Sequence, residues 1–260
     1  MSSQSPVPEA VVASCPRPVN RPIMLQGWKD LASVHWRFRP DDVQRLLPPE
    51  FTVDTHEGNA LVGLIPFHME CIRLPRLPAF GPLSTFPETN VRTYIVDRSG
   101  RRGVWFMSLD VTRLIPALVA RVSYNLPYCW ASMSIEHTGN TVSYRSRRRW
   151  PRGEARSVLS VEIGDRIEDD AVSDLEHFVT ARWALGSTWA GRPIWAHVDH
   201  EPWPLHRARI IECDETMLRA AGLPTPVGEP IVLWSPGVDV RIGRPRLLRR
   251  RPGGPEGQRE

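Results

Sequence analysis

The sequence lacks any long apolar run of the kind that crosses a membrane. No stretch of about 18 apolar residues occurs, and residues 1–22 hold no apolar segment with a basic start and a cleavage site. We therefore expect a cytoplasmic protein with no membrane partner and no secretory leader. Residues 1–22 are rich in proline and serine, so they cannot bury enough apolar surface to order themselves, and we expect a disordered leader there.

Cysteine and metal-binding motifs are also sparse. The four cysteines stand singly, without the C-x-x-C pair that would indicate a zinc site or a redox centre. Among the eight histidines, His197 and His200 come closest to a metal-binding spacing. Residues three apart on a strand face opposite sides of the sheet, however, so these two rings would not converge on one ion. We expect no metal and no cofactor.

Lysine is nearly absent, because Lys29 is the only lysine in the chain. The motifs of several common enzyme classes are missing as well: G-x-S-x-G, G-x-x-x-x-G-K-S/T, G-x-G-x-x-G and H-E-x-x-H. The sequence therefore offers no motif that would indicate an α/β-hydrolase, a P-loop protein, a dinucleotide-binding protein or a zinc protease.

Positive charge is concentrated at the end of the chain. The net charge is +4, but residues 241–260 hold seven arginines against two glutamates and contribute +5, which leaves −1 for residues 1–240. A basic segment followed by Pro-Gly-Gly-Pro is more often a solvated end than a nucleic-acid arm. We therefore expect residues 244–260 to form a basic disordered tail, and we expect no nucleic-acid partner.

Proline and tryptophan are abundant, with 26 and 10 residues respectively. This composition is typical of many short strands joined by proline-marked turns around an aromatic interior. Apolar runs separated by turn signals predict hairpins at residues 56–59 and 98–102. Strands and helices do not alternate regularly, which argues against a Rossmann or TIM-barrel fold and favours an antiparallel sheet or barrel. We expect one mostly β domain of the α+β class over residues 23–243.

A few short helices are expected among the strands. One short helix is predicted to begin at Pro40. The other three are predicted over Thr112–Ser123, Ser173–Trp183 and Glu215–Ala221. Ser173 and Glu176 have the spacing of a capping box, in which each side chain satisfies a free backbone N–H of the first turn. Gly222 is placed to end the last helix.

The most informative stretch is the strand predicted at residues 88–94. Side chains alternate between the two faces of a strand, so a carboxylate, an amide, a guanidinium and a phenol share one row. They belong to Glu88, Asn90, Arg92 and Tyr94. Such a row often faces water. These groups, however, are donors and acceptors suited to a carboxylate or an enolate, and the flanking strands are too apolar for a freely solvated sheet. We predict that the row lines a cavity.

A second polar cluster lies at the end of the partner strand and beyond it. It consists of Asp110, Arg113 and Arg121. Hairpin pairing would bring Asp110 near the start of the strand at residue 88. A buried carboxylate beside an arginine is more often a structural ion pair than a catalytic group. Tyr128 and Trp203 stand at strand entrances, where each could line a pocket or simply pack in the core.

Several motifs together carry a family resemblance. They are Val34-His35-Trp36, residues 88–94, 103–110 and 178–185, Leu126-Pro127-Tyr128, and residues 200–205. In this order, from about Trp28 to Ile242, they resemble the YqjF-like bacterial family. The resemblance implies an acetoacetate decarboxylase-like fold, a cone-shaped antiparallel β-barrel with a few flanking helices and a polar cavity. It also makes His35 a candidate ligand-binding residue and Glu88 a candidate cavity glutamate.

The resemblance bears on mechanism as well. In acetoacetate decarboxylases a buried lysine after a Gly-aromatic-Pro type turn forms a Schiff base with the keto acid. The comparable turn here is residues 125–129, Asn-Leu-Pro-Tyr-Cys, which has no lysine. Lys29 lies in an early segment that does not match this motif. The resemblance therefore implies the fold without Schiff-base decarboxylation.

Three functions stay open from the sequence. The first is a barrel that binds a small anionic or carbonyl-bearing ligand through the row at residues 88–94 and through Arg113, Arg121, Tyr128, His35 and Trp203. The second is a lysine-independent lyase, dehydratase, cyclase or isomerase, with Glu88 or Asp110 as general base and Arg92 with Tyr94 stabilising an oxyanion. The third is a structural or partner-binding role that uses the arginine-rich tail. Homo-oligomerisation is also open.

Overall fold

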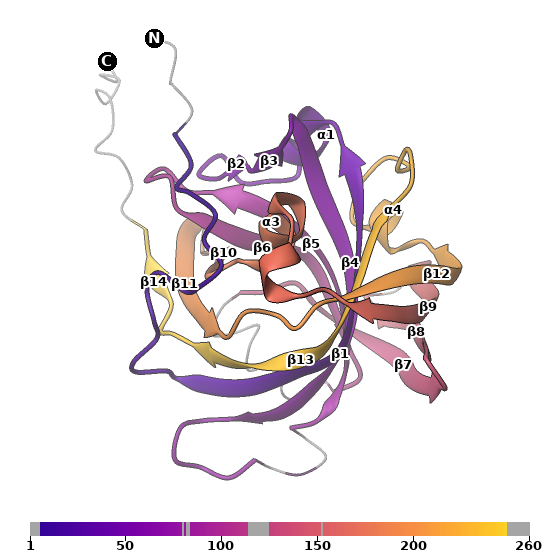
Figure 1. The fold of residues 1–260 in the computed structure, drawn as a ribbon. Helices are drawn as coiled ribbons and strands as arrows, with labels where there is room; N and C mark the ends of the chain where they lie inside the picture. Colours follow the sequence, from indigo (N-terminus) through magenta and orange to yellow (C-terminus); the bar gives the residue numbers. More distant parts are fainter. Residues whose placement is uncertain (1–5, 80, 82–83, 114–124, 152, 249–260) are drawn as a thin grey trace, which may run out of the picture.

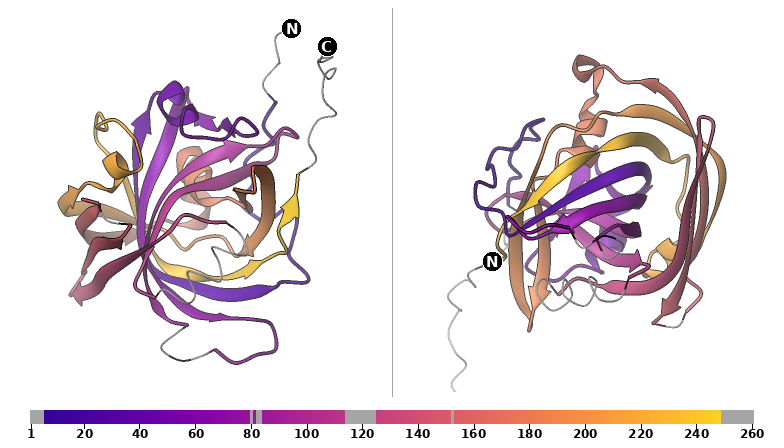
Figure 2. Two further views of the ribbon diagram at one scale, coloured as in Figure 1. Left: turned by 180° about the vertical axis from the view of Figure 1, so that it is seen from behind. Right: turned by 90° about the horizontal axis from the view of Figure 1, so that it is seen from below.

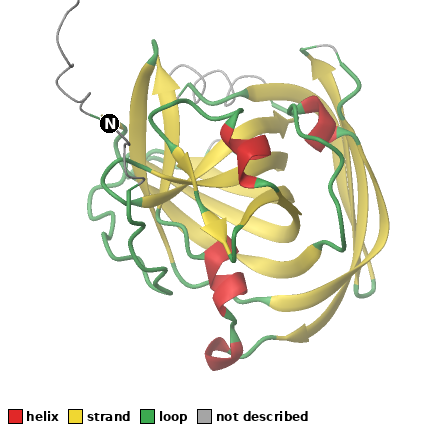
Figure 3. Cartoon of the chain, turned by 90° about the horizontal axis from the view of Figure 1, so that it is seen from above, coloured by secondary structure: helices red, strands yellow, loops and turns green. Residues whose placement is uncertain are grey.

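The computed structural model describes residues 6–79, 81, 84–113, 125–151 and 153–248. Arg121 and most of the helix expected over Thr112–Ser123 lie outside these ranges. Within them the chain is mostly strand, and its helices are short, separate turns beside the strands (Figure 3). None of the helices in the described part is long and apolar enough to span a bilayer.

The strands follow one another along nearly the whole described chain (Figure 1). They are β1 Met24–Phe38, β2 Thr52–Val53, β3 Thr55–His56, β4 Asn59–Arg73, β5 Phe86–Val96, β6 Arg102–Val111, β7 Tyr128–Thr138, β8 Thr141–Trp150, β9 Arg156–Arg166, β10 Ala184–Trp189, β11 Arg192–His200, β12 His206–Glu215, β13 Ile231–Ile242 and β14 Arg246–Leu247. The helices are α1 Pro40–Gln44, the 3-10 turn η2 Asp169–Ala171, α3 Asp174–Thr180 and α4 Met217–Ala220.

These strands form one 14-stranded sheet that closes on itself. β13, β1, β4, β5 and β6 are consecutive neighbours, through the pairing of β5 with β6. On one side β10 and β11 connect β6 back to β13, and on the other side β7, β8, β9 and β12 do the same. The result is a ring of strands that curve around a common interior (Figure 2).

The ring is not purely antiparallel, which corrects the prediction. β6 pairs in parallel with both β7 and β10. Each of these partners is reached by a long connection rather than a tight turn, and a long connection lets the chain return in the same direction. The two parallel contacts are short, whereas the remaining pairings, including the β4–β5 and β5–β6 hairpins, are antiparallel.

Several local signals operate as predicted. Glu57 and Gly58 both have positive φ, 49° and 77°, which gives the tight hairpin between β3 and β4. Ser173 and Glu176 form the capping box at the start of α3. That helix ends at Thr180 rather than at Trp183, so the predicted C-terminal boundary is wrong. The carbonyl of Trp183 accepts a hydrogen bond from the N–H of Val198, which draws the chain into extended pairing.

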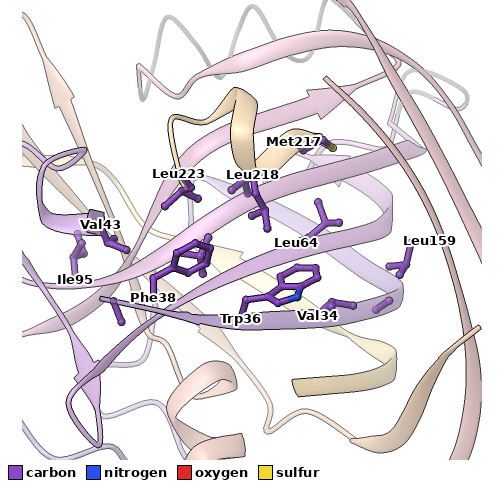
Figure 4. Close-up of a cluster of buried hydrophobic side chains, with 14 of the residues drawn as sticks. Val34, Trp36, Phe38, Val43, Leu64, Ile95, Leu159, Met217, Leu218 and Leu223 are labelled. Atoms are coloured by element: carbon purple, nitrogen blue, oxygen red, sulfur yellow. The ribbon is translucent and has the colours of Figure 1, made fainter. Parts of the chain in front are cut away.

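The largest hydrophobic cluster lies between β1, β4 and the helices α1 and α4 (Figure 4). Trp36 and Phe38 of β1 pack in this cluster with Val43 of α1 and with Met217 and Leu218 of α4. Burying one such side chain contributes about 1.5–3 kcal/mol. The short helices are therefore held by their apolar contacts with the sheet, because a helix of four or five residues is unstable alone.

Residues 6–22 form no helix or strand, but they are attached to the outside of the ring. The N–H of Glu9 donates to the carbonyl of Gly100 at 2.8 Å, and the indole N–H of Trp183 donates to the carbonyl of Val12 at 3.1 Å. The N–H of Val19 donates to Asp199 at 3.0 Å. The described part of the predicted leader is thus in contact with the sheet at several points.

Candidate functional site

An interior pocket of about 80 Å³ lies inside the ring. Most of its wall is apolar and aromatic, and includes Phe67 and Met69 of β4, Phe86 of β5 and Phe106 of β6. Polar side chains enter it only from a few positions, namely Gln26, Glu88, Asn90, Arg92, Thr180, Arg182 and His200. The pocket is therefore less polar than the cavity implied by the family resemblance.

The polarity of the wall changes along β5. Phe86 lies opposite Met69, Glu88 opposite Phe67, and Arg92 opposite Gly63 in the β4–β5 register. A pocket that follows this strand is apolar near residue 86 and carries its carboxyl, amide and guanidinium groups farther along. Because alternation along a strand is a local property, these three polar side chains share a face.

Tyr94 continues the row but does not line the pocket. Its hydroxyl donates to the carbonyl of Val179 in α3 at 2.8 Å and lies 2.7 Å from Nε2 of His35. Both rings are fully buried. Burial, aided by the charges of Arg92 and Arg182, holds the pKa of His35 well below its ordinary value, so this ring is neutral. Tyr94 and His35 link α3 to the sheet, and neither of them lines the pocket, so the predicted site roles of both are wrong for this pocket.

Glu88 is an acidic residue of the pocket wall, and its pKa is strongly raised. Its side chain is buried, and burial raises its pKa from 4.5 to about 8; the negative charge of Asp110 acts in the same direction, while a hydrogen bond from Asn90 opposes it. Glu88 is therefore protonated at neutral pH and can donate as well as accept. Its Oε2 has no hydrogen-bond partner among the described residues.

Two arginines face the pocket from different parts of the fold. Arg92 donates to the carbonyl of Val179 at 3.3 Å. Arg182 follows α3, and its Nε donates to the carbonyl of Phe178 at 2.7 Å while its Nη1 donates to Asp54 at 2.7 Å. Asp54 is itself buried and forms an ion pair with a second arginine as well. Arg182 is thus held in place by groups outside the pocket.

Sequence reasoning missed Arg182 and assigned His200 no site role. Arg182 lay inside the predicted helix, and its ion-pair partner is 128 positions away in the chain. His200 lines the pocket, its Nδ1 lies 2.7 Å from the carbonyl oxygen of Glu201, and burial lowers its pKa. Both residues lie within family motifs of the sequence, residues 178–185 and 200–205, but neither motif indicates that these two side chains face a pocket.

The pocket gathers polar atoms that lack partners. Five of its lining residues each have one buried nitrogen or oxygen without a hydrogen-bond partner among the described residues. These atoms are Trp28 Nε1, Glu88 Oε2, Asn90 Oδ1, Arg92 Nε and Arg182 Nη2. Unpartnered buried polar atoms are uncommon in folded proteins and call for water or a ligand. Three of the five are obligate donors, so the pocket is suited to an acceptor-rich group.

The other predicted site residues take different places. Asp110 is fully buried and accepts two hydrogen bonds from Arg148, at 2.6 and 3.0 Å, so it is held in a structural ion pair outside the pocket. It lies opposite Thr89 in the β5–β6 register, near the start of β5 as the hairpin predicted. Arg113 is exposed and does not line the pocket.

The two aromatic candidates do line it. Tyr128 and Trp203 are both part of the pocket wall. Trp203 stacks on Trp28, with ring centroids 6.0 Å apart and an interplanar angle of 20°. His200 packs at 5.4 Å against Trp203 and at 4.5 Å against Trp183. Trp28, His200 and Trp203 therefore form an aromatic cluster in the pocket wall. It lies where β1, the end of β11 and the segment after β11 meet.

Metal ligands are not gathered here. Among the residues that the structure describes, no group of three or more His, Cys, Asp and Glu side chains is arranged to hold an ion. His200 lines the pocket whereas His197 does not, so the two rings face different sides of β11 as the strand spacing predicts.

Comparison with known proteins identifies the family. Residues 25–239 match the model of DUF2071, described as an uncharacterized conserved protein. The chain belongs to this family. It is 29% identical over 218 residues to the uncharacterized protein YqjF of Bacillus subtilis (strain 168), a match that covers 84% of this chain and 89% of the relative.

Solved structures show the fold of this DUF2071 member. An acetoacetate decarboxylase-like enzyme from Sphingomonas wittichii RW1 superimposes with a TM-score of 0.61 at 14% identity, over 87% of this chain and 92% of its own. The enduracididine biosynthesis enzyme MppR in complex with pyruvate gives a TM-score of 0.59 at 14% identity, over 94% and 98%. The chain therefore has an acetoacetate decarboxylase-like fold, as the sequence motifs implied.

The only lysine of this family member lies away from the interior pocket. Lys29 is on β1, where its ammonium is 3.4 Å from Asp239, and its side chain is about one third exposed. It does not line the interior pocket. The groups available there for chemistry are a carboxyl, two guanidinium groups, an imidazole, two amides, a hydroxyl and a phenol.

Proposed function

We propose that this protein binds a small carboxylate- or carbonyl-bearing molecule in the interior pocket. The observation that carries the proposal is the set of unpartnered buried atoms on Trp28, Glu88, Asn90, Arg92 and Arg182, all on one pocket. Such atoms lose their contacts with water on folding and regain hydrogen bonds only from a bound molecule or ordered water. A ligand with acceptor oxygens satisfies several of them at once.

The change from apolar to polar side chains along β5 orients this ligand. Its anionic or carbonyl oxygens lie toward Arg92 and Arg182, because guanidinium groups hold carboxylates strongly in a dry site. Its apolar part lies toward Phe86 and Met69, where the wall offers no hydrogen bonds. Protonated Glu88 donates to a neutral carbonyl oxygen between these two ends. The complex of MppR with pyruvate supports a small keto acid as the first class to test.

Binding can be measured by isothermal titration calorimetry with a panel of small keto acids and their matching alcohols and amides. We expect the carboxylates to bind and the amides to bind more weakly. Arg92→Met removes one guanidinium and no ion pair of the described residues, so the variant should fold and lose carboxylate binding. The exposed Arg113→Met is the matched control and should bind as the wild type does. Equal affinity in all three proteins would contradict the proposal.

A second candidate function is acid-base catalysis by Glu88. The observation in its favour is a buried carboxyl with a pKa raised to about 8 and a free Oε2 on the pocket. A general acid or base works best when its pKa lies near the operating pH. In this scheme Glu88 moves a proton on a carbonyl substrate while Arg92 and Arg182 stabilise the enolate oxygen. Tyr94 has no part in it, since its hydroxyl is bonded within the α3 contact.

Proton exchange separates the two functions. A keto acid that binds to the wild-type protein in D2O would exchange the hydrogens on the carbon next to its carbonyl if Glu88 is catalytic, and NMR would show the loss of signal. Glu88→Gln should then retain binding and stop the exchange. Binding without any exchange above the protein-free rate would leave only the binding function.

The position of Lys29 supports a chemistry without a Schiff base. A Schiff base needs an amine that reaches the substrate carbonyl, with its pKa lowered by its surroundings. The Lys29 ammonium is instead paired with Asp239, and neither residue lines the interior pocket. Borohydride treatment in the presence of a bound keto acid should therefore give no covalent adduct by mass spectrometry, and a single adduct on Lys29 would refute this.

A further inference from the structure

A second cleft lies on the outside of the ring, between residues 17–23, the middle of β11 and the segment that leads into β14. Its volume is about 720 Å³, and it shares no lining residue with the interior pocket. The N-terminal segment runs past β11 and β14 on this side of the molecule (Figure 1). The cleft is thus formed by both ends of the described chain packed against one strand.

The lining of this outer cleft is strongly basic. Arg17, Arg21, Arg244 and Arg246 contribute to it, and all four are exposed. Arg17 is paired with Glu9. The other three have no ion-pair partner among the residues described. The acid nearest in sequence to this part of β11, Asp199, already accepts the N–H of Val19. Asp199 is thus a negative charge beside the cleft, but three arginines without ion-pair partners among the described residues leave an excess of positive charge there.

A histidine provides the buried polar group of the cleft. Nδ1 of His197 is buried and has no hydrogen-bond partner among the described residues. The backbone of Trp183 lies close to the same ring. Burial lowers the pKa of His197, and the nearby charges of Arg101, Arg17 and Arg246 lower it further. The ring is therefore neutral near pH 7, and its free nitrogen accepts a proton rather than donating one.

We propose that this outer cleft binds a phosphate group that carries one proton, as in hydrogen phosphate or the monoanion of a phosphomonoester. The P–O–H group donates to Nδ1 of His197, and the remaining oxygens accept hydrogen bonds from the guanidinium groups of Arg21, Arg244 and Arg246. Arginine is well suited to this task, because its planar fork of donors matches phosphate oxygens. The site is independent of the interior pocket and of the function proposed for it.

The arginines of the outer cleft lie outside the residues that match the family model. The DUF2071 match covers residues 25–239, whereas these arginines lie at positions 17, 21, 244 and 246. Only His197 belongs to the shared region. A relative that lacks the two flanking segments would therefore lack the charge that holds the anion.

The donor and acceptor pattern predicts a preference for phosphate over sulfate. Sulfate carries no proton near neutral pH, so it cannot donate to Nδ1 of a neutral His197. Near pH 6 about half of a phosphomonoester still carries its second proton, since the second pKa is about 6. A site of arginines alone would not separate the two anions, which have similar size and shape.

Calorimetric titration at pH 7.0, where inorganic phosphate carries at least one proton, compares inorganic phosphate with sulfate on the full-length protein. The wild type should bind phosphate more tightly than sulfate. The triple variant R21A/R244A/R246A should bind phosphate more than about tenfold more weakly, because charge-assisted hydrogen bonds are lost. The matched control is R145A/R147A/R149A, which removes three exposed arginines from β8. Equal losses in the two triple variants, or no loss in the first, would overturn the proposal.

Variants at the histidine test the buried contact separately. H197N keeps a hydrogen-bonding atom near the position of Nδ1, whereas H197F removes it. We expect H197F to bind phosphate and sulfate equally and H197N to retain part of the preference, with thermal unfolding in the absence of anions showing that both fold. An unchanged preference in H197F would exclude the proposed role of Nδ1. Vesicles with phosphatidic acid, compared with soluble phosphomonoesters, distinguish a lipid headgroup from a free ligand.

Discussion

The protonation of Glu88 gives the sharpest prediction for this protein. The side chain is buried, and its pKa is raised to about 8 from an ordinary value of 4.5. Below pH 4.5 the carboxyl is protonated in both the folded and the unfolded chain. Between pH 4.5 and 8 the unfolded chain releases the proton while the folded protein keeps it. The unfolded state therefore binds fewer protons, and the contribution of Glu88 to stability falls as the pH rises through this window.

The size of the effect follows from the shift. Each pKa unit corresponds to about 1.4 kcal/mol, so the interval from 4.5 to about 8 corresponds to roughly 5 kcal/mol of lost stability above pH 8. Even half of this value would be a large part of the 5–15 kcal/mol that is typical of a folded domain. Glu88→Gln is neutral at every pH and nearly identical in shape, so it escapes the loss. The variant should match the wild type near pH 4.5 and exceed it in stability above pH 8.

Urea unfolding followed by tryptophan fluorescence can measure both proteins between pH 5 and 9. The informative quantity is the difference in free energy of unfolding between Glu88→Gln and the wild type, because other titrating groups cancel. This difference should grow as the pH rises from 5 to about 8 and then level off. Glu168→Gln, an exposed position, is the control and should give a flat difference. A flat difference for Glu88→Gln as well would mean that Glu88 is ionised at neutral pH, which would remove the acid-base proposal.

Three further predictions concern groups that hold the site from outside. Tyr94→Phe removes the buried hydroxyl that bonds both the carbonyl of Val179 and Nε2 of His35. It should cost about 1–3 kcal/mol in urea unfolding, with ligand affinity unchanged; a loss of affinity would place Tyr94 in the site. Asp54→Asn leaves Arg182 buried without its counter-charge and should cost about 3–5 kcal/mol and weaken carboxylate binding, so an unaltered affinity would refute its positioning role. Ser173→Ala removes the cap of α3 and should cost about 1 kcal/mol of unfolding free energy by the same assay. An unchanged unfolding free energy would mean that the capping box does not stabilise α3.

Local features of the fold could be predicted because they depend on neighbouring residues. The hairpin at residues 56–59 follows from a turn signal that contains Gly58, which adopts positive φ, although the second positive φ falls on Glu57; the start of α3 follows from the capping box. The placement of Glu88, Asn90 and Arg92 on one face follows from the two-residue repeat of a strand. The succession of short strands and the family motifs implied the acetoacetate decarboxylase-like fold, which the structural comparisons show.

Contacts between distant segments decided the rest. The two-residue repeat gives no indication that α3 would cover the row at Tyr94, since the helix lies 85 positions away. The ion pair of Asp110 with Arg148 and the entry of Arg182 into the pocket depend likewise on closure of the ring. The parallel pairings of β6 could not be foreseen for the same reason.

The sequence alone thus determined which residues alternate between the faces of a strand, which form turns and which cap a helix. It also showed that the lysine needed for a Schiff base is missing from the expected turn. Only the tertiary structure decided which polar side chains share the interior pocket, since that depends on how the strands close around it. The raised pKa of Glu88 is the clearest case: its residue type and its position near Asn90 and Asp110 could be predicted from the sequence, but the complete burial that shifts its pKa could not. A carboxyl takes its pKa from the solvent and charges around it, and these are properties of the folded chain.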